Sequence, residues 1–219
     1  MKKTINKIYL TWRKGKGGKR FVIGSLKRNV SEGVSFKYSP KGVKEATLEG
    51  FSVYDGFPDV NQLYTTNVLE IFSQRLTRSD RSDSKPLYDF WLISNDMDNF
   101  NLIGYSQALL PTDNFELLAD FFPVVGLTFV TEIAGLSSTQ VSSNILNEGD
   151  SLEYRLEEEN EHDKYAVALY KDEIKLGYVK KVNSRVFHKS KNPISVSVKS
   201  LQKNGIIKRA FIKVEILAK

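Results

Sequence analysis

Apolar and polar residues alternate with a period of two in three short segments near the start of the chain. The segments cover residues 7–12, 21–26 and 34–38, and glycine-rich or polar residues separate them. This alternation is typical of strands that bury one face. We therefore predict an antiparallel meander of three strands, with the glycine-rich residues 15–19 in the first turn.

Residues 39–66 contain several glycines and prolines, which favours a loop with short ordered pieces. Apolar residues at helical spacing follow Asn67. Asn67 is a suitable N-cap and Glu70 lies three positions later, so the pattern predicts a helix that begins with a capping box.

The pattern is less regular from residue 77 onward. Residues 79–84 predict a polar turn, and Pro86 suits the first turn of a helix that ends at Leu92. Two short apolar runs follow, at 102–105 and 115–118. We predict a strand for each of them.

From Pro123 onward the chain becomes a series of short apolar segments. The predicted strands cover residues 126–131, 152–156, 166–170, 174–179, 194–198 and 212–216. Asn204 and Gly205 form a strong hairpin signal because both residues tolerate positive φ. Residues 171–173 suit another hairpin turn, and a short helix is expected after the fourth strand. Five or six strands with regular turns predict a small β-barrel.

The change at Pro123 predicts two domains. Residues 1–122 would form an α+β domain, in which two or three helices follow the antiparallel meander. Residues 123–219 would form the barrel. The predicted fold class is therefore mainly β, of the α+β type.

Positive charge gathers at both ends of the chain. Residues 1–44 hold 13 Lys and Arg against one acid, and residues 174–219 hold 12 against one. Residues 132–173 instead hold 11 acids and three bases. Clustered Lys and Arg gain free energy on a polyanion by releasing its counterions, so the two ends favour a nucleic-acid partner. The alternative is that they are solvated faces balanced by the acidic stretch.

Composition narrows the classes of function. The 219 residues are 41% hydrophobic, which is ordinary for globular domains. The absence of cysteine excludes disulfides, thiolate metal sites and cysteine nucleophiles, and with two histidines we expect no metal and no cofactor. No apolar run reaches the roughly 20 residues of a membrane helix. The basic first residues lack the apolar stretch of a secretory signal, so we expect a cytoplasmic protein that does not act on a membrane.

Four separated motifs follow one another in the second half. They are Ile-Ala-Gly-Leu at 133–136, Gly-Asp-Ser-Leu at 149–152, Glu-Glu-Asn-Glu-His-Asp-Lys-Tyr-Ala-Val at 158–167 and Leu-Gly-Tyr-Val-Lys-Lys at 176–181. In residue type and spacing they resemble the HIRAN domain, a modified OB-like β-barrel. In eukaryotic fork-remodelling helicases this domain captures the 3′ end of single-stranded DNA. The resemblance therefore implies a non-catalytic protein that binds single-stranded DNA, with a 3′ end as one form of the ligand.

The resemblance also implies which residues contact DNA. Asp163 matches the acid that accepts the 3′-hydroxyl, and His162 takes the place of the aromatic residue before it. Tyr178 follows the glycine of the Gly-Tyr motif and would contact bases or backbone. Apart from the resemblance, Trp12 and Tyr165 are further aromatic candidates, for which packing in the core is the alternative. The phosphate-facing side would carry the basic residues Lys180, Lys181, Arg185, Lys189 and Lys191.

Three positions depart from the family pattern. Ser137 and Ser138 belong to the predicted DNA-binding set, but end-binding relatives have basic and aromatic residues there. Stacking a base on an aromatic ring is worth about 1–3 kcal/mol, which serine does not supply. Glu161 replaces a proline and adds negative charge. The two serines favour a second hypothesis, a protein-interaction module such as an antitoxin-like or defence-system subunit, with the barrel as its scaffold.

The first 80 residues resemble the N-terminal subdomain of HipA-type toxin kinases. The resemblance rests on Ile-Gly-Ser-Leu at 23–26, on residues 34–40 and on residues 64–76. In that family the subdomain packs on the kinase body and touches the antitoxin. The resemblance implies that the N-terminal part docks a co-encoded protein and performs no chemistry.

A catalytic alternative rests on Asp163, Glu173 and Lys175, which have the D…E-x-K spacing of metal-dependent nucleases. In such enzymes the carboxylates hold Mg²⁺ and the lysine polarises the attacking water. Asp172 and Glu173 also suit a hairpin tip. The sequence thus leaves three hypotheses, of which a non-enzymatic nucleic-acid-binding protein is the first.

Overall fold

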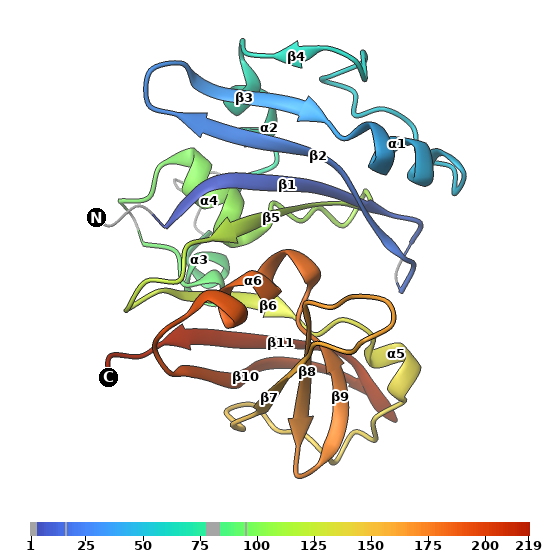
Figure 1. Ribbon diagram of the computed structural model, residues 1–219, viewed down its shortest axis with the longest axis vertical. Helices are drawn as coiled ribbons and strands as arrows, with labels where there is room; N and C mark the ends of the chain where they lie inside the picture. The colour runs from blue at the N-terminus through green and yellow to red at the C-terminus, as the bar shows by residue number, and fades with distance from the viewer. Residues whose placement is uncertain (1–3, 16, 78–83, 95) are drawn as a thin grey trace. The chain divides into compact units, whose positions relative to one another are not determined.

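The structure is a computed structural model of the 219-residue chain (Figure 1). It describes residues 4–219 except 16, 78–83 and 95, and it does not describe the side chain of residue 137. The predicted polar turn at 79–84 therefore lies outside the described residues except for its last residue, as does Lys16 of the glycine-rich turn. The chain divides into two compact units, Met1–Asp120 and Phe121–Lys219.

The first unit is built on a five-stranded sheet with the strand order β4-β3-β2-β1-β5. Its strands are β1 (Ile5–Arg13), β2 (Arg20–Asn29), β3 (Gly33–Tyr38), β4 (Leu63–Tyr64) and β5 (Phe115–Phe121). β1, β2 and β3 form the predicted antiparallel meander (Figure 1). The strand predicted at 115–118 is β5.

The register of these strands explains why the sheet has one buried face. Ile8 pairs with Leu26, Leu26 pairs with Phe36, and all three are fully buried. The rings of Phe57 and Phe72 pack on Phe36, with centroid distances of 4.7 and 5.4 Å. Because side chains alternate along a strand, the residues one position away lie on the opposite face of the sheet.

Short helices pack around this sheet. In the described part of the unit they are α1 (Pro40–Thr47), α2 (Val68–Ser73), α3 (Ser84–Trp91) and α4 (Asn99–Ser106). The helices predicted after Asn67 and around Pro86 are α2 and α3. Asn67 has a φ of 53° and makes no side-chain cap bond, so the predicted capping box is wrong.

Two further predictions for this unit are wrong. The strand predicted at 102–105 is part of α4, and the side chain of its N-cap Asp98 accepts a hydrogen bond from the Asn101 N–H. The loop predicted at 39–66 begins with α1, which has Ser39 as its N-cap and a proline in its first turn. The short apolar run at 102–105 has no decisive period. The N-cap residues Asp98 and Ser39 were the local signals for these two helices.

The second unit contains two three-stranded antiparallel sheets, with the orders β10-β11-β6 and β7-β8-β9. The strands are β6 (Thr128–Glu132), β7 (Glu153–Glu157), β8 (Ala166–Lys171), β9 (Ile174–Tyr178), β10 (Ile194–Asn204) and β11 (Ile206–Ile216). Its helices are α5 (Leu136–Thr139) and α6 (Lys181–Lys189), the second of which was predicted. Among the described residues of the whole chain, no helix has the length and apolar character to cross a membrane.

The predicted barrel is not a closed one. Single bridges join the two sheets, one between Ala134 and Tyr178 and one between Ser151 and Ser197. Pairing after β6 stops because the chain turns at Gly135, which has a φ of +84°, and enters α5. The expectation of a closed sheet is therefore wrong, while the mainly β, α+β fold class with antiparallel sheets is confirmed.

The two hairpin turns predicted for this unit are confirmed. β10 and β11 pair on either side of Gly205, which has a φ of +69°. Asp172 and Glu173 connect β8 to β9 and have φ values of 48° and 63°. Two successive residues with positive φ suit the tight turns that join antiparallel strands.

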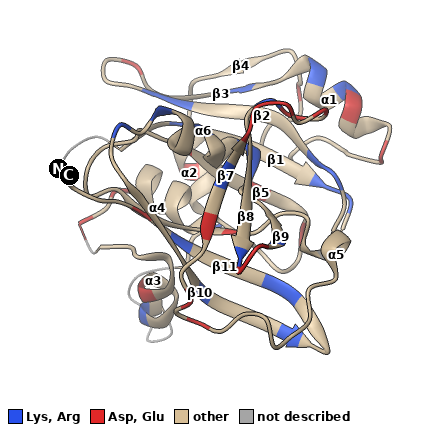
Figure 2. Cartoon of the chain, turned by 60° about the horizontal axis from the view of Figure 1, so that its bottom comes forward, with Lys and Arg blue, Asp and Glu red and all other residues tan. Residues whose placement is uncertain are grey.

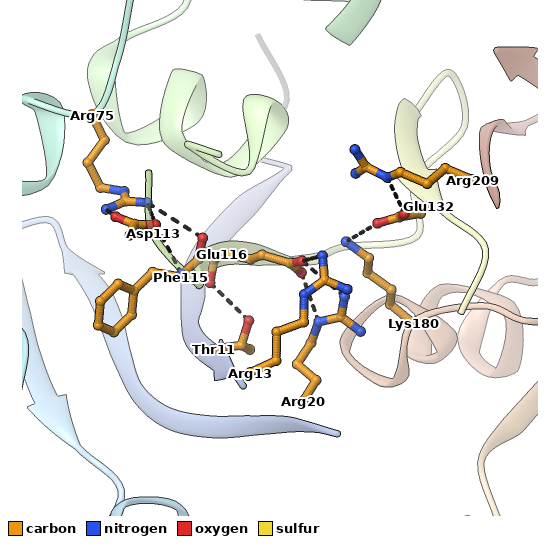
Figure 3. A network of polar contacts seen from close by, with 10 residues as sticks. All are labelled: Thr11, Arg13, Arg20, Arg75, Asp113, Phe115, Glu116, Glu132, Lys180 and Arg209. Carbon is orange, nitrogen blue, oxygen red and sulfur yellow. Dashed lines mark hydrogen bonds and ion pairs between the residues drawn. The ribbon is translucent and has the colours of Figure 1, made fainter. Parts of the chain in front are cut away.

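Each unit holds a buried carboxylate between cations, as Figure 3 shows. In the first unit, Glu116 pairs with Arg13 at 3.0 Å and with Arg20 at 2.8 Å. In the second unit, Glu132 pairs with Arg209 at 2.6 Å and with Lys180 at 3.9 Å. A charge that leaves water without such partners costs roughly several kcal/mol. Some of the basic residues at both ends of the chain therefore stabilise the fold by pairing with buried carboxylates.

Candidate nucleic-acid interface

One side chain, Asn160, organises the loop between β7 and β8. Its Oδ1 accepts hydrogen bonds from the backbone N–H groups of His162 and Asp163, both 3.0 Å long. Asparagine favours such turns because its short amide reaches nearby backbone groups. Its Nδ2 donates to Glu157 Oε2 at 2.9 Å and to the Tyr178 hydroxyl at 3.3 Å. This amide thus positions both predicted DNA-binding residues next to the end of β9.

Tyr178 is held through its hydroxyl. Lys175 Nζ donates to this hydroxyl at 2.7 Å, and the hydroxyl donates to Glu157 Oε2 at 3.1 Å. A hydrogen bond from Lys175 to Glu157, 2.7 Å long, lowers the pKa of the Glu157 carboxyl. Burial acts to lower the pKa of Lys175, but its bonds to Glu157 and Tyr178 outweigh burial and raise that pKa. Lys175 and Glu157 are therefore both charged at neutral pH, and both engage the hydroxyl of Tyr178. Lys175 Nζ also lies 4.4 Å from the centre of the Tyr178 ring.

Asp163 lies beside the first turn of α6. Its Oδ1 accepts a hydrogen bond from the Tyr165 N–H at 3.1 Å and lies 3.4 Å from Lys181 Nζ. The side chain is 20% exposed, and among the described residues no hydrogen bond involves its Oδ2. The carboxylate is thus held in place by one oxygen and remains within reach of a ligand.

The outer face of α6 carries a line of basic residues. Lys181, Arg185 and Lys189 are spaced four positions apart, so they lie on one side of the helix. The Lys181 side chain is 70% exposed, Lys189 is exposed and Arg185 is half-buried. The opposite side packs Val186 and Phe187 into the core. Three of the predicted phosphate contacts therefore share one face.

Lys180 does not belong to that face. It is the N-cap residue of α6, its side chain is 1% exposed, and its Nζ lies 3.9 Å from Glu132 Oε2. The prediction that Lys180 contacts phosphate is wrong, because its charge is buried against a carboxylate of β6. Lys191, just after α6, is exposed as expected of a phosphate contact.

An aromatic pair links the end of the loop to the end of α6. Tyr165 is 52% exposed, and its ring lies 5.6 Å from the His188 ring at an interplanar angle of 85°. His188 Nε2 lies 3.2 Å from the Tyr165 carbonyl oxygen. The loop therefore contacts α6 twice, through Asp163 and Lys181 and through this pair. We call residues 160–165 together with Lys181, Arg185, His188 and Lys189 the loop–helix surface.

Comparison with known proteins identifies this part of the chain. The family model of the HIRAN domain matches residues 126–200. The second unit contains a HIRAN domain. HIRAN domains are nucleic-acid-binding modules, so the loop–helix surface lies in a domain of that kind.

One solved structure also resembles the chain, the crystal structure of the HIRAN domain of human HLTF. The likeness has a TM-score of 0.32 and 14% sequence identity, and it covers 40% of this chain and 74% of that one. A search of curated proteins found no match.

Ser137 and Ser138 lie in α5 of the HIRAN domain. Ser138 is exposed, and its N–H donates to the Gly135 carbonyl at 2.9 Å. Thr139 Oγ1 donates to the Leu176 carbonyl at 3.0 Å, which holds α5 against β9. No ring stands at position 138, so this position provides no surface for base stacking.

The loop has an acidic side as well. Glu158, Glu159 and Glu161 are exposed, and residues 156–160 line an open hollow of about 510 Å³. Carboxylates repel phosphate groups. A nucleic-acid strand is therefore expected to approach from the side of α6.

The three residues of the nuclease hypothesis have separate partners. Glu173 pairs with Arg155 at 2.6 Å, Lys175 pairs with the carboxylate of Glu157 at 2.7 Å, and Asp163 pairs with a lysine of α6. Throughout the part of the chain that the structure describes, no group of three or more His, Asp or Glu side chains is placed to hold a metal ion.

The sequence predicted a role for most of the charged residues that the structure places on the loop–helix surface, but it did not predict what positions them. It did not predict roles for Asn160 or Glu157, which organise the loop through hydrogen bonds to residues 18–21 positions away in β9. It also did not predict the contact between Tyr165 and His188, which are 23 positions apart. The short Asn-x-His-Asp spacing was the one local signal, because asparagine often accepts from N–H groups two and three residues on.

Proposed function

We propose that the HIRAN domain binds single-stranded DNA along the loop–helix surface. The observation that supports this proposal is that exposed cations and exposed rings lie together there. Lys181 and Lys189 follow one side of α6, and Tyr165 and His162 lie on the loop that contacts it. Sequence-tolerant binding of single strands uses this combination, with cations on the backbone and rings on the bases.

Asp163 suits a free 3′ end as the preferred form of the ligand. A 3′-hydroxyl needs a hydrogen-bond acceptor, and Oδ2 can accept while Oδ1 keeps its contacts to Tyr165 and Lys181. A 3′-phosphate would instead bring negative charge to the carboxylate, which is unfavourable. Lys181, 3.4 Å from Asp163, is close enough to neutralise the phosphodiester next to a bound end.

Fluorescence anisotropy with labelled oligonucleotides tests the strand-binding proposal. The double variant Lys181→Glu, Lys189→Glu is expected to weaken binding to all single-stranded sequences. Loss of two phosphate contacts should reduce the slope of log Kd against log salt concentration by about 1.4, at about 0.7 per contact. The control is Lys199→Glu, Lys208→Glu, which makes the same change of charge on β10 and β11. Equal losses in the two variants would mean that only net charge matters, and the proposed surface would be wrong.

Oligonucleotides that end in a 3′-hydroxyl or a 3′-phosphate test end recognition. Asp163→Asn is expected to remove the preference for the free hydroxyl. Binding to the 3′-hydroxyl end should weaken, and binding to the 3′-phosphate end should not weaken, because the repulsion by the carboxylate is gone. The same loss on both ends would refute end capture while leaving strand binding intact. Duplex and RNA probes in the same assay define which nucleic acid is preferred.

Ser138 is the observation that favours the second candidate, a protein-interaction module. Its exposed hydroxyl provides no stacking surface where the resemblance implies one. This candidate predicts that no oligonucleotide binds even at low salt, together with a stable complex between the purified chain and a co-encoded protein.

A further inference from the structure

Lysines occupy the sheet face of the first unit that lies opposite its aromatic core. Lys7 on β1 pairs with Lys27 on β2, and Lys27 pairs with Ser35 on β3. Directly paired strand residues have their side chains on the same face. Figure 2 shows basic positions along β1, β2 and β3. Two like charges thus stand opposite each other in one antiparallel ladder, an arrangement that destabilises a strand pair unless an anion lies nearby.

The neighbouring row of the same face adds a ring and a third lysine. Tyr9 pairs with Ser25, and Ser25 pairs with Lys37. Tyr9 lies two positions after Lys7, so both side chains point to the same side of β1. The aromatic residue of this face is thus Tyr9 and not Trp12, which is 8% exposed and packs on the core ring of Phe51.

These lysines have no acidic partner among the residues that the structure describes. Lys7 Nζ donates to the Tyr9 hydroxyl at 3.0 Å and lies 4.2 Å from the centre of that ring. Lys27 and Lys37 are exposed and form no ion pair with any described residue. On the same strands, Arg13 and Arg20 both pair with Glu116, whereas the three lysines that line the groove have no such partner among the described residues.

The face is hollowed into an open groove of about 420 Å³. The three lysines, Tyr9, Ser25 and Ser35 all line it, and its described lining contains no carboxylate. Ammonium and hydroxyl groups are among the donors that proteins use on phosphate oxygens. The groove therefore provides donors and positive charge in one place.

We infer that this groove is a second nucleic-acid contact, which binds the sugar–phosphate backbone of a single strand. Adjacent strands lie about 4.8 Å apart and alternate residues along a strand about 6.6 Å apart, so the flexible stems of three lysines can follow successive phosphates. The ring of Tyr9 provides a surface on which a base can stack, which an acidic protein segment would not use. The inference concerns the first unit and does not depend on the function proposed for the HIRAN domain.

Charge reversal tests the groove directly. Lys27→Glu with Lys37→Glu removes two cations and places a carboxylate opposite Lys7. Opposite charges across a ladder are favourable, so the variant is expected to fold. Its binding to a fluorescent oligothymidylate should weaken, and the slope of log Kd against log salt concentration should fall by about 1.4. Thermal unfolding of the variant confirms that the unit remains folded.

The matched control changes two other exposed lysines of the first unit, Lys44→Glu and Lys85→Glu, which do not line the groove. The inference requires that this control retain most of the wild-type affinity and salt slope. If both double variants lose the same affinity, or if neither loses any, the groove is not a specific contact and the inference is wrong.

Repeating the measurement in a chain that also carries Lys181→Glu and Lys189→Glu separates the two surfaces. If Lys181→Glu and Lys189→Glu have no effect but the groove variant loses affinity, the HIRAN proposal fails and the groove remains supported. If only the changes in α6 lower the affinity, the groove inference is wrong and the HIRAN proposal stands. A labelled polyglutamate peptide tests the other class of partner. Peptide binding that depends on Lys27 and Lys37, without an effect on oligothymidylate, would overturn the inference in favour of an acidic protein segment.

Discussion

Replacing Asn160 by alanine should loosen the loop that presents Asp163 while keeping the side chains of His162, Asp163 and Tyr178 themselves. The change removes one acceptor shared by the His162 and Asp163 N–H groups and one donor to Glu157 and Tyr178. A typical intramolecular hydrogen bond contributes about 0.5–1.5 kcal/mol net. Water can replace part of this network because the loop is at the surface. We therefore expect Asn160→Ala to lower the free energy of unfolding by about 1–3 kcal/mol, towards the lower end of that range.

Urea unfolding measures the stability change, and anisotropy with a single-stranded oligonucleotide measures its consequence for binding. The control is Asn144→Ala, because Asn144 is an exposed asparagine whose Oδ1 accepts one hydrogen bond, 2.6 Å long, from Ser142. Surface changes of that kind usually lie within about 0.5 kcal/mol of wild type. Asn160→Ala should weaken binding to a free 3′ end, and Asn144→Ala should not.

The reasoning would be refuted if Asn160→Ala were as stable as Asn144→Ala. It would also be refuted if the variant lost stability but bound a 3′-hydroxyl oligonucleotide as tightly as wild type under conditions where it remains folded. In that case the position of Asp163 would not depend on the loop that Asn160 organises.

Three other predictions concern single positions of the HIRAN domain. Lys180→Met should lower the urea midpoint of unfolding but leave the salt slope of DNA binding unchanged, because this lysine is buried; a smaller slope would show that it contacts phosphate. Gly177→Ala should cost about 1–3 kcal/mol in urea unfolding, since a Cβ would lie 2.4 Å from the Ala134 carbonyl oxygen; wild-type stability would contradict the bridge there. The folded-state pKa of Glu157 is lowered from its ordinary value of 4.5, so its contribution to stability is complete above that pH and is lost as pH falls further. The thermal midpoint of Glu157→Gln should therefore fall less than that of wild type on acidification, and parallel curves would refute this.

Local chemistry predicted the elements that depend on neighbouring residues. Asn204 and Gly205 mark a hairpin because the backbone of such a turn requires positive φ, and β10 and β11 meet there. The line of Lys181, Arg185 and Lys189 follows from helical spacing alone once a helix is expected. In these cases the residues that specify the structure lie within one turn or one hairpin.

The wrong predictions concern residues whose structure depends on parts of the chain that lie far away in the sequence. Leu102 to Tyr105 form a short apolar run that suits a strand or a helix, and packing against the rest of the unit decides between them. Lys180 and Lys181 are neighbours with the same side chain, yet one is buried on Glu132 and the other is 70% exposed. Only the fold, which brings α6 next to β6, separates the two lysines.

Nuclear magnetic resonance provides the most direct test of the central claim that the loop–helix surface binds single-stranded DNA. Backbone amide shifts are recorded while a short oligonucleotide with a free 3′-hydroxyl is titrated into the intact chain. Within the HIRAN domain, the account predicts that the largest changes fall on residues 160–165 and on the exposed side of α6. Changes in that domain confined to β10 and β11, or to the acidic residues 157–159, would contradict it.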